Sequence, residues 1–291
     1  MAPSVVLITG CSTGMGLATA VHLATKSKHD FKVYATMRNL AKKGQLETAA
    51  GETLEKTLFI RELDVTKNDT ITSLVDEIVR DNGRIDVVFN NAGFSVFDDY
   101  FMGDEPLDAA KTMMDTNVWG PTRVMQAVLP VMKKQKSGRI INTTSGEGIE
   151  GYPFHGFYSA SKFALQGLSE NLSPILRQVY NIKLSVLVPG PVYNPSFAII
   201  MDPAFKPEYI CGKWDSPSQE VFLDYWQRDM QPIIQAYQQP EEVAELVERI
   251  ILSEDPYVRY PTGSLIAKRM ADQLIDPTGN VAGGLYHSFK Q

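Results

Sequence analysis

Short apolar runs alternate with longer amphipathic stretches along most of the chain. The apolar runs are nearly continuous and rich in β-branched residues, which is typical of strands buried on both faces of a sheet. The amphipathic stretches repeat their apolar residues every three or four positions, as a helix does when it packs on such a sheet. Six strands are predicted in this way, at residues 5–9, 32–37, 57–63, 87–90, 139–144 and 183–188.

The order of the predicted elements indicates the fold class. Strands alternate with helices, which predicts an α/β fold with a Rossmann-type, doubly wound parallel sheet. No internal repeat or low-complexity linker divides the sequence, and a chain of 291 residues that is 44% hydrophobic can bury one large core. We therefore predict a single domain over residues 1–291. The predicted helices cover residues 16–26, 71–82, 109–134, 157–180 and 240–253.

The segment 189–239 departs from this pattern. It is rich in proline and aromatic residues, among them Trp214 and Trp226. A connection of this length in a compact domain is usually a functional lid or a binding loop. We therefore predict that it forms a C-terminal substrate-binding lid, with a surface between subunits as the alternative use of its aromatic residues.

Composition narrows the compartment and the partners. The net charge of -6, without any dense block of Lys and Arg, predicts no binding of nucleic acid. Two cysteines, Cys11 and Cys211, are too few for a disulfide framework and favour the cytoplasm. The sequence shows no signal-peptide pattern and no apolar run near the ~20 residues that cross a bilayer, so no integral membrane segment is expected. The four histidines have no metal-ligand spacing, and no metal is expected.

A glycine-rich loop directly follows the first predicted strand. It reads Thr-Gly-Cys-Ser-Thr-Gly-Met-Gly over residues 9–16. Glycines at a strand-to-helix turn let backbone N–H groups approach a pyrophosphate at the helix N-terminus. Taken alone, the same glycines could merely turn the chain. The candidate phosphate-binding residues are Gly10, Ser12, Thr13, Gly14, Met15 and Gly16.

The end of the second predicted strand bears on the choice of nucleotide. Thr36, Met37 and Arg38 stand where an NAD-selective site usually offers an acidic side chain to the ribose 2′-hydroxyl. Because no acid is present, Arg38 could instead pair with a 2′-phosphate; an ordinary surface arginine is the alternative. We therefore expect NADP(H) to be preferred over NAD(H).

A candidate acid and base group stands at the start of the fourth predicted helix. Tyr158 and Lys162 are four residues apart and therefore share one helix face. Such pairs are usually ordinary half-buried positions. Here, however, Ser145 follows the fifth predicted strand, and Asn117 lies in the helix after the fourth strand.

These motifs resemble the classical short-chain dehydrogenase/reductase family. The glycine loop looks like its TGxxxGxG signature, and the run from Asn90 to Gly93 looks like its NNAG motif. The resemblance extends over almost the whole chain. It is closest to the branch that contains type 1 17β-hydroxysteroid dehydrogenase and photoreceptor-type retinol dehydrogenase. It implies an enzyme that moves a hydride between nicotinamide and a carbonyl or alcohol group.

The resemblance also implies roles for particular residues. Tyr158 would donate or accept the proton, and Lys162 would hold the nicotinamide ribose and favour the phenolate by its charge. Ser145 would hydrogen-bond the substrate oxygen, and Asn117 would position a water. Further cofactor contacts match the family at Asp64, Val65, Asn91, Ala92, Gly93, Tyr158, Lys162, Pro189, Gly190 and Val192. The family often has threonine where this chain has Asn194.

The substrate is expected to be a bulky lipophilic carbonyl or alcohol, because apolar and aromatic residues dominate the predicted pocket walls. Glu147 and His155 nevertheless make the region after Ser145 more polar than a plain steroid slot. A histidine in this place is more often packed or on the surface than bound to substrate. The candidate substrate-binding residues are Ser145, Glu147, Tyr152, His155 and Tyr158.

Two expectations concern the protein as a whole. Family members commonly pair through the two long helices, so the resemblance implies a homodimer or homotetramer. A catalytically silent NADP-binding or scaffold protein of the same fold is the alternative function. All four tetrad side chains are present, which favours the enzyme.

Overall fold

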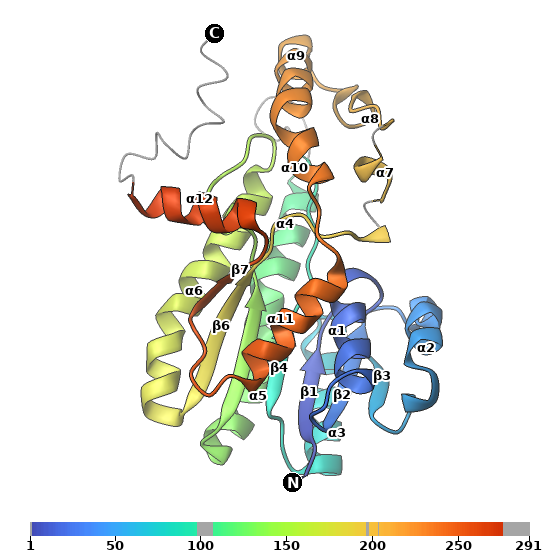
Figure 1. Cartoon of the computed structure of the whole chain (residues 1–291), viewed down its shortest axis with the longest axis vertical. Coiled ribbons are helices and arrows are strands. Elements are labelled where there is room, and N and C mark those ends of the chain that lie inside the picture. The colour runs from blue at the N-terminus through green and yellow to red at the C-terminus, as the bar shows by residue number, and fades with distance from the viewer. Residues whose placement is uncertain (1, 98–106, 196–197, 203, 276–291) are drawn as a thin grey trace.

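The computed structural model describes residues 2–97, 107–195, 198–202 and 204–275. Its centre is a parallel sheet of seven strands in the order β3-β2-β1-β4-β5-β6-β7 (Figure 1). The predicted Rossmann-type fold class is therefore confirmed. The strands are β1 (Ser4–Ile8), β2 (Phe31–Met37), β3 (Leu58–Glu62), β4 (Val87–Asn90), β5 (Gly138–Thr143), β6 (Ile182–Val188) and β7 (Arg259–Pro261).

The six predicted strands are confirmed, and each end differs from its prediction by at most one residue. β7 was not predicted, because its three residues form no apolar run. The predicted helix at residues 109–134 is divided into α4 and α5 by a π-helical turn at Asp115–Trp119. The helices are α1 (Gly14–Thr25), α2 (Gly44–Ala50), α3 (Asn68–Asn82), α4 (Asp108–Met114), α5 (Gly120–Gln135), α6 (Gly156–Tyr180), α7 (Ala198–Met201), α8 (Glu208–Cys211), α9 (Ser216–Tyr225), α10 (Gln231–Gln235), α11 (Pro240–Leu252) and α12 (Ser264–Ile275).

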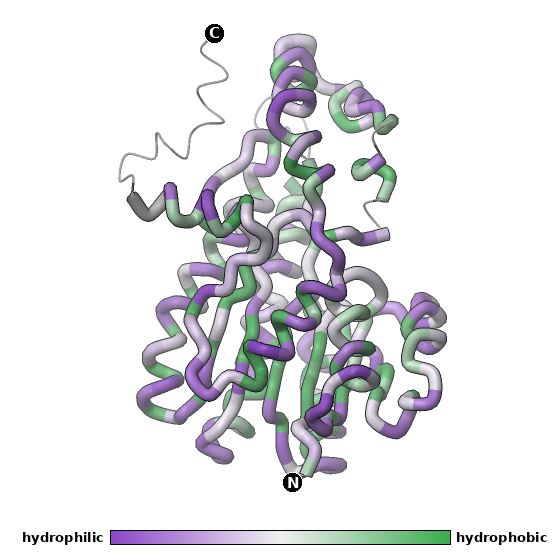
Figure 2. The backbone as a smooth tube through the Cα atoms, viewed as in Figure 1, coloured by the Kyte–Doolittle hydropathy of each residue, from purple (hydrophilic) through white to green (hydrophobic). Residues whose placement is uncertain are grey.

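Two hydrophobic cores hold the helices against opposite faces of the sheet. One core joins the sheet to α3, α5 and α6, and the other joins it to α1, α2 and α11. The strands are accordingly the most hydrophobic part of the chain (Figure 2). Strands covered on both faces need apolar side chains in both directions, which explains their nearly continuous apolar sequence.

The strand order reverses at β1. Its last residue, Ile8, pairs with Ala35 of β2 on one side and with Phe89 of β4 on the other. The chain leaves β1 and β4 toward opposite faces of the sheet, which opens a crevice beyond their carboxyl ends. In doubly wound sheets, ligands bind in this crevice.

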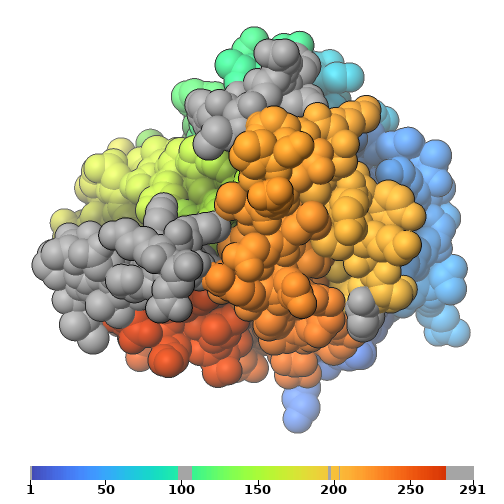
Figure 3. All heavy atoms as spheres, turned by 90° about the horizontal axis from the view of Figure 1, so that it is seen from above, coloured from blue at the N-terminus to red at the C-terminus, as the bar shows by residue number. Residues whose placement is uncertain are grey.

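The described part of the segment 189–239, called the lid segment below, lies above that edge of the sheet (Figures 1 and 3). It contains the short helices α7 to α10. These helices were not predicted, because three of them span only four or five residues and the ten residues of α9 have a weakly amphipathic pattern. They enclose a third, largely aromatic core whose buried members include Phe222, Tyr225 and Trp226.

Candidate active site

The glycine loop turns β1 into α1 with almost no room for side chains. Gly10 and Gly14 have φ angles of 75° and 59°, which lie in the left-handed region that favours glycine. A Cβ atom on Gly16 would collide with the carbonyl oxygen of Gly10. Because these positions carry no side chains, the backbone N–H groups at the N-terminus of α1 could approach a ligand closely, and the helix dipole there favours negative charge.

The loop after β4 braces the glycine loop from the side. The Asn91 side-chain amide donates to the carbonyl oxygens of Thr9 and Gly10, at 2.9 and 3.0 Å. The Thr9 hydroxyl accepts from the backbone N–H groups of Asn91 and Ala92, both at 3.0 Å. Four hydrogen bonds thus join the ends of β1 and β4 across the crevice.

A third loop reaches the same crevice from β6. The side-chain nitrogen of Asn194 would stand 2.8 Å from a Cβ atom on Gly14. Pro189 accepts a hydrogen bond from the Gly146 N–H at 3.1 Å, and Val192 bridges to Gln238 at the far end of the lid segment. Gly190 donates its N–H to the Thr262 hydroxyl at 3.4 Å. Asn194 thus lies against the glycine loop.

The candidate adenosine end of the crevice carries Arg38 and Asp64. Burial raises the pKa of Asp64, but hydrogen bonds from Thr66 and the charges of Arg38 and Lys67 outweigh it, and the net shift is downward. Arg38 is exposed. Thr36 is fully buried, and its hydroxyl donates to the Ile8 carbonyl at 2.9 Å.

Three of the predicted catalytic side chains meet where α6 begins. The Ser145 hydroxyl hydrogen-bonds the Tyr158 side chain. Lys162 places its Nζ 5.5 Å from the centre of the Tyr158 ring and donates to the Thr143 carbonyl at 3.0 Å. A Cβ atom on Gly93 would stand 3.5 Å from the same Nζ, so the loop after β4 reaches this group directly.

Asn117, the fourth predicted catalytic residue, lies in the π-helical turn between α4 and α5 and is buried. Its side-chain oxygen accepts from the Phe94 N–H at 3.1 Å. Its nitrogen donates to the Phe94 carbonyl at 2.9 Å and to the Ser161 hydroxyl at 3.1 Å. Asn117 therefore fixes the loop after β4 to α6, and its predicted role in positioning a water stays a prediction.

Two residues that the sequence reasoning did not select support this group. Ser159 and Ser161 are buried in the first two turns of α6 and hydrogen-bond Glu147 and Asn117 respectively. Their signal in the sequence is the run of small residues between Tyr158 and Lys162. Larger side chains there would separate α6 from its neighbours.

The Glu147 carboxylate receives two hydrogen bonds beside Tyr158. The Ser159 hydroxyl donates to it at 2.9 Å, and His155 Nδ1 lies 2.9 Å from one of its oxygens and 3.1 Å from the other. The rings of His155 and Tyr158 are 5.7 Å apart and nearly perpendicular. The structure thus brings together the predicted substrate-binding residues Ser145, Glu147, His155 and Tyr158.

Tyr152, the fifth of that set, is buried but engaged elsewhere. Its hydroxyl is a hydrogen-bond partner of Arg269 on α12 at 3.1 Å. Arg269 also pairs with the Glu150 carboxylate at 2.9 Å. These contacts attach α12 to the loop after Ser145. No sequence motif predicted them.

Burial raises the pKa of Tyr158, and the nearby charge of Glu147 raises it further, while the hydrogen bond with Ser145 lowers it. The net direction is opposite to the expected effect of Lys162. Burial of the phenol is the largest cause of this rise, and burial also lowers the pKa of Lys162 to about 8, although the charge of Glu147 acts in the other direction. The protein's own groups thus keep the phenol of Tyr158 protonated at neutral pH.

Replacing Glu147 with Gln should lower the pH at which alcohol oxidation becomes half-maximal. With Tyr158 as the predicted base, oxidation would need its phenolate, and the replacement would remove the negative charge that opposes its formation. The measurement is kcat/KM for alcohol oxidation as a function of pH. A matched replacement of Glu150 by Gln alters a carboxylate already paired with Arg269 and should shift the profile less. An unchanged profile in the Glu147 variant would contradict the proposed influence of this carboxylate.

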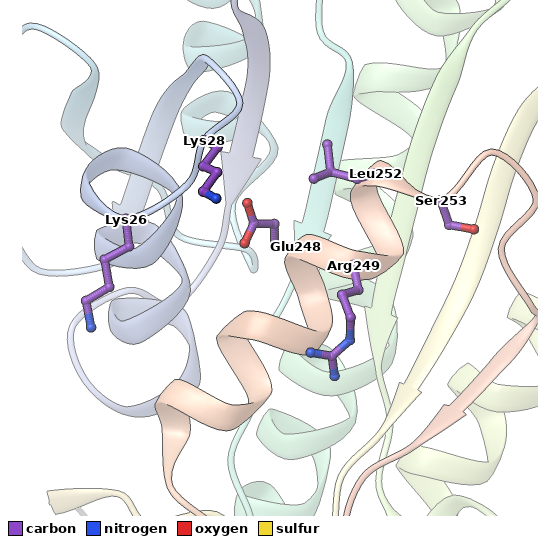
Figure 4. Close-up of a pocket in the computed structure, with 6 residues that line it drawn as sticks. All are labelled: Lys26, Lys28, Glu248, Arg249, Leu252 and Ser253. Atoms are coloured by element: carbon purple, nitrogen blue, oxygen red, sulfur yellow. The ribbon is translucent and has the colours of Figure 1, made fainter.

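A separate surface hollow lies at the other end of the sheet (Figure 4). It is lined by Lys26, Lys28, Glu248, Arg249, Leu252 and Ser253, from the end of α1 and the end of α11. None of the predicted catalytic or cofactor-binding residues reaches it. We therefore exclude this hollow as the catalytic site.

Within the described ranges, no group of three or more His, Cys, Asp or Glu side chains is placed to hold a metal ion. Across the same residues, no helix combines the length and the apolar character needed to cross a membrane.

A phosphate-binding turn and a Tyr-Lys-Ser group at the switch point of a doubly wound sheet are typical of dinucleotide-dependent oxidoreductases. The family model described as short chain dehydrogenase matches residues 4–200. The chain belongs to this short-chain dehydrogenase family.

Individual relatives agree with this assignment. Retinol dehydrogenase 8 of Bos taurus is 36% identical over 281 residues, covering 96% of this chain and 88% of the relative. The 17-beta-hydroxysteroid dehydrogenase type 1 of Homo sapiens is 36% identical over 282 residues, covering 96% and 84%. A short chain dehydrogenase/reductase from Burkholderia phymatum, solved in complex with NAD, has the same fold with a TM-score of 0.75 at 22% identity, over 94% of each chain. The branch predicted from the sequence is thus confirmed as a similarity.

Proposed function

We propose that this protein is an NADP(H)-dependent oxidoreductase that interconverts a carbonyl and an alcohol on a bulky apolar substrate, with Tyr158 as the acid and base. The observation that carries the proposal is the meeting of Tyr158, Ser145 and Lys162 beside the braced glycine loop. This arrangement sets a proton donor next to the place where the crevice can hold a nicotinamide.

The residues divide the work of carbonyl reduction. The crevice beside the glycine loop would hold the nicotinamide, which would supply the hydride for the carbonyl carbon. Tyr158 donates its phenolic proton to the carbonyl oxygen, so that the C=O bond becomes a CH–OH group. Ser145 orients that oxygen, and Lys162 stabilises the phenolate that remains. Because burial and Glu147 raise the pKa of Tyr158, the phenol is protonated at neutral pH, which is the form that donates the proton in carbonyl reduction.

The preference for NADP(H) rests on the end of β2. Thr36 and Met37 are buried and carry no acid for a ribose 2′-hydroxyl. Arg38 is exposed at the same strand end and acts on Asp64 through its charge, so its guanidinium is available to a 2′-phosphate.

The apolar character of the substrate rests on the lid segment. Phe97, in the loop after β4, packs against His155 with ring centres 4.0 Å apart and contacts Phe222 and Trp226 of the lid segment edge-on. An aromatic cluster thus adjoins His155, whose ring centre lies 5.7 Å from that of Tyr158. The names of the two relatives, a retinol and a hydroxysteroid dehydrogenase, point to the same substrate class.

The test is consumption of NADPH by the purified protein with a panel of steroid ketones, retinals, aliphatic ketones and quinones. We expect turnover with at least one lipophilic class and slower turnover with NADH. NADPH binding without turnover of any class would instead favour the silent binding protein.

We also propose a homodimer built on α6, in a reducing compartment such as the cytoplasm. Ile175 and Val179 leave 51% and 63% of their surface exposed on this helix, and Trp119 leaves 55% exposed before α5. Both cysteines are free and buried.

Light scattering should give at least twice the mass of one chain for the natural protein. The double replacement of Ile175 and Val179 by Glu should give the mass of one chain, because like charges would face each other across a two-fold interface. A natural protein that stays monomeric at high concentration would contradict the dimer.

A further inference from the structure

We propose that Nε2 of His155 binds a hydroxyl group of the substrate that lies close to the reacting carbonyl and is distinct from it. The preferred substrates are then hydroxyketones and the corresponding diols. This inference rests on the proposed function and specifies its substrate class. It starts from one side chain, His155, of which only 7% of the surface is exposed.

Glu147 determines which ring nitrogen of His155 carries the proton. A carboxylate accepts hydrogen bonds, and this one already accepts from the Ser159 hydroxyl. The His155 Nδ1 at 2.9 Å from it therefore carries a proton and donates. The tautomer and the plane of the ring are both fixed by this contact, and Nε2 is left to face any other partner.

Nε2 is buried and has no hydrogen-bond partner among the residues that the structure describes. A buried polar atom without a partner is costly and is uncommon in folded proteins. The atom belongs to a residue within one helical turn of Tyr158, and the two ring centres are 5.7 Å apart. A ligand atom that satisfies Nε2 therefore lies near the reacting carbonyl.

The surroundings restrict the chemistry of that ligand atom. Phe97 covers one face of the imidazole and supplies no conventional hydrogen-bonding atom. A carbonyl oxygen would suit Nε2 only when the imidazole is protonated. A carboxylate would meet the charge of Glu147, and an ammonium group would meet Lys162, which also lies at Tyr158. A hydroxyl group is neutral and both donates and accepts, so it pairs with Nε2 in either protonation state of the ring.

The probes are propiophenone and its α-hydroxy and β-hydroxy derivatives. All three contain the aromatic ketone that Phe97 and Trp226 would contact. Only the two derivatives carry the additional hydroxyl group that Nε2 would bind. With NADPH, we expect kcat/KM of at least one hydroxyketone to exceed that of propiophenone by about 10- to 100-fold. Replacement of His155 by Phe should reduce this ratio to a few-fold, since only the intrinsic reactivity of the ketones would remain.

The matched control is the replacement of His22 by Phe. His22 is also a histidine paired with a glutamate, Glu248, at 2.6 Å, but it lies on α1 near the hollow of Figure 4. Its replacement should leave the ratio unchanged. A structural effect of losing His155 would lower turnover of all three ketones together, whereas loss of recognition lowers the ratio.

A binding measurement separates this inference from the proposed function. The Tyr158→Phe variant saturated with NADPH is titrated with each probe by calorimetry, with and without His155→Phe. Tighter binding of a hydroxyketone that disappears with His155→Phe supports the inference, whether or not the natural protein turns over any ketone. Equal affinities for the three probes, absence of measurable binding of either hydroxyketone, or a preference that survives His155→Phe would overturn it.

Discussion

Replacing Tyr158 with Phe should slow carbonyl reduction by about 100- to 10,000-fold, the range over which a positioned general acid acts. The variant loses only the phenolic hydroxyl, which hydrogen-bonds Ser145. The ring and its contact with His155 remain, and so do the braced glycine loop and Asn194 on the cofactor side. NADPH affinity should therefore stay within a few-fold of that of the natural protein.

Steady-state turnover with the best ketone of the panel and NADPH fluorescence titration measure the two quantities. Tyr180→Phe is the matched control, because it removes the same hydroxyl from the other end of the same helix. Its turnover should match that of the natural protein. If Tyr158→Phe retained more than about a tenth of the natural activity, a different group would have to supply the proton.

Replacing Arg38 with Asp should lower the preference for NADPH over NADH by about 100-fold or more. One charge-assisted hydrogen bond to a phosphate contributes about 1.5–3 kcal/mol, or roughly 10- to 100-fold in affinity. The new carboxylate would also repel a 2′-phosphate and could accept a hydrogen bond from a 2′-hydroxyl. The measurement is the ratio of kcat/KM for the two reduced cofactors with one ketone.

Arg80→Asp makes the same change of charge on α3, where Arg80 pairs with the neighbouring Asp81 in an exposed position. It should leave the ratio nearly unaltered. Equal use of the two cofactors by the natural protein, or an unaltered ratio in Arg38→Asp, would assign Arg38 to the solvated surface and leave the preference for NADP(H) without support.

The sheet was predictable because its strands are covered on both faces and therefore need apolar side chains at successive positions. The same reasoning could not find β7, which extends over Arg259–Pro261 and pairs with β6 at the edge of the described sheet. It also missed the lid helices, whose residues follow the packing around Phe222 and Trp226 rather than a local period.

The candidate site was predictable where a motif fixes a local turn, as at the glycine loop, or where spacing places two side chains on one helix face, as for Tyr158 and Lys162. Its electrostatics were not. The pKa of Tyr158 is raised first by burial and then by the charge of Glu147, and the attachment of α12 depends on Arg269 meeting Glu150. Both interactions join different segments of the chain, and the local sequence pattern does not indicate which segments come together in the fold.

The hydrogen bonds from Asn91 to Thr9 and Gly10 have a consequence for protein engineering. Asn91 stands two residues before Gly93, which adjoins both Asn117 and Lys162. The loop that would bind the pyrophosphate and the residues that would move the proton are thus both held by the short segment from Asn91 to Gly93. Random substitutions in this segment should alter dinucleotide affinity and turnover together. Arg38 lies outside this segment, so substitutions at Arg38 should change the choice of coenzyme independently of the turnover rate.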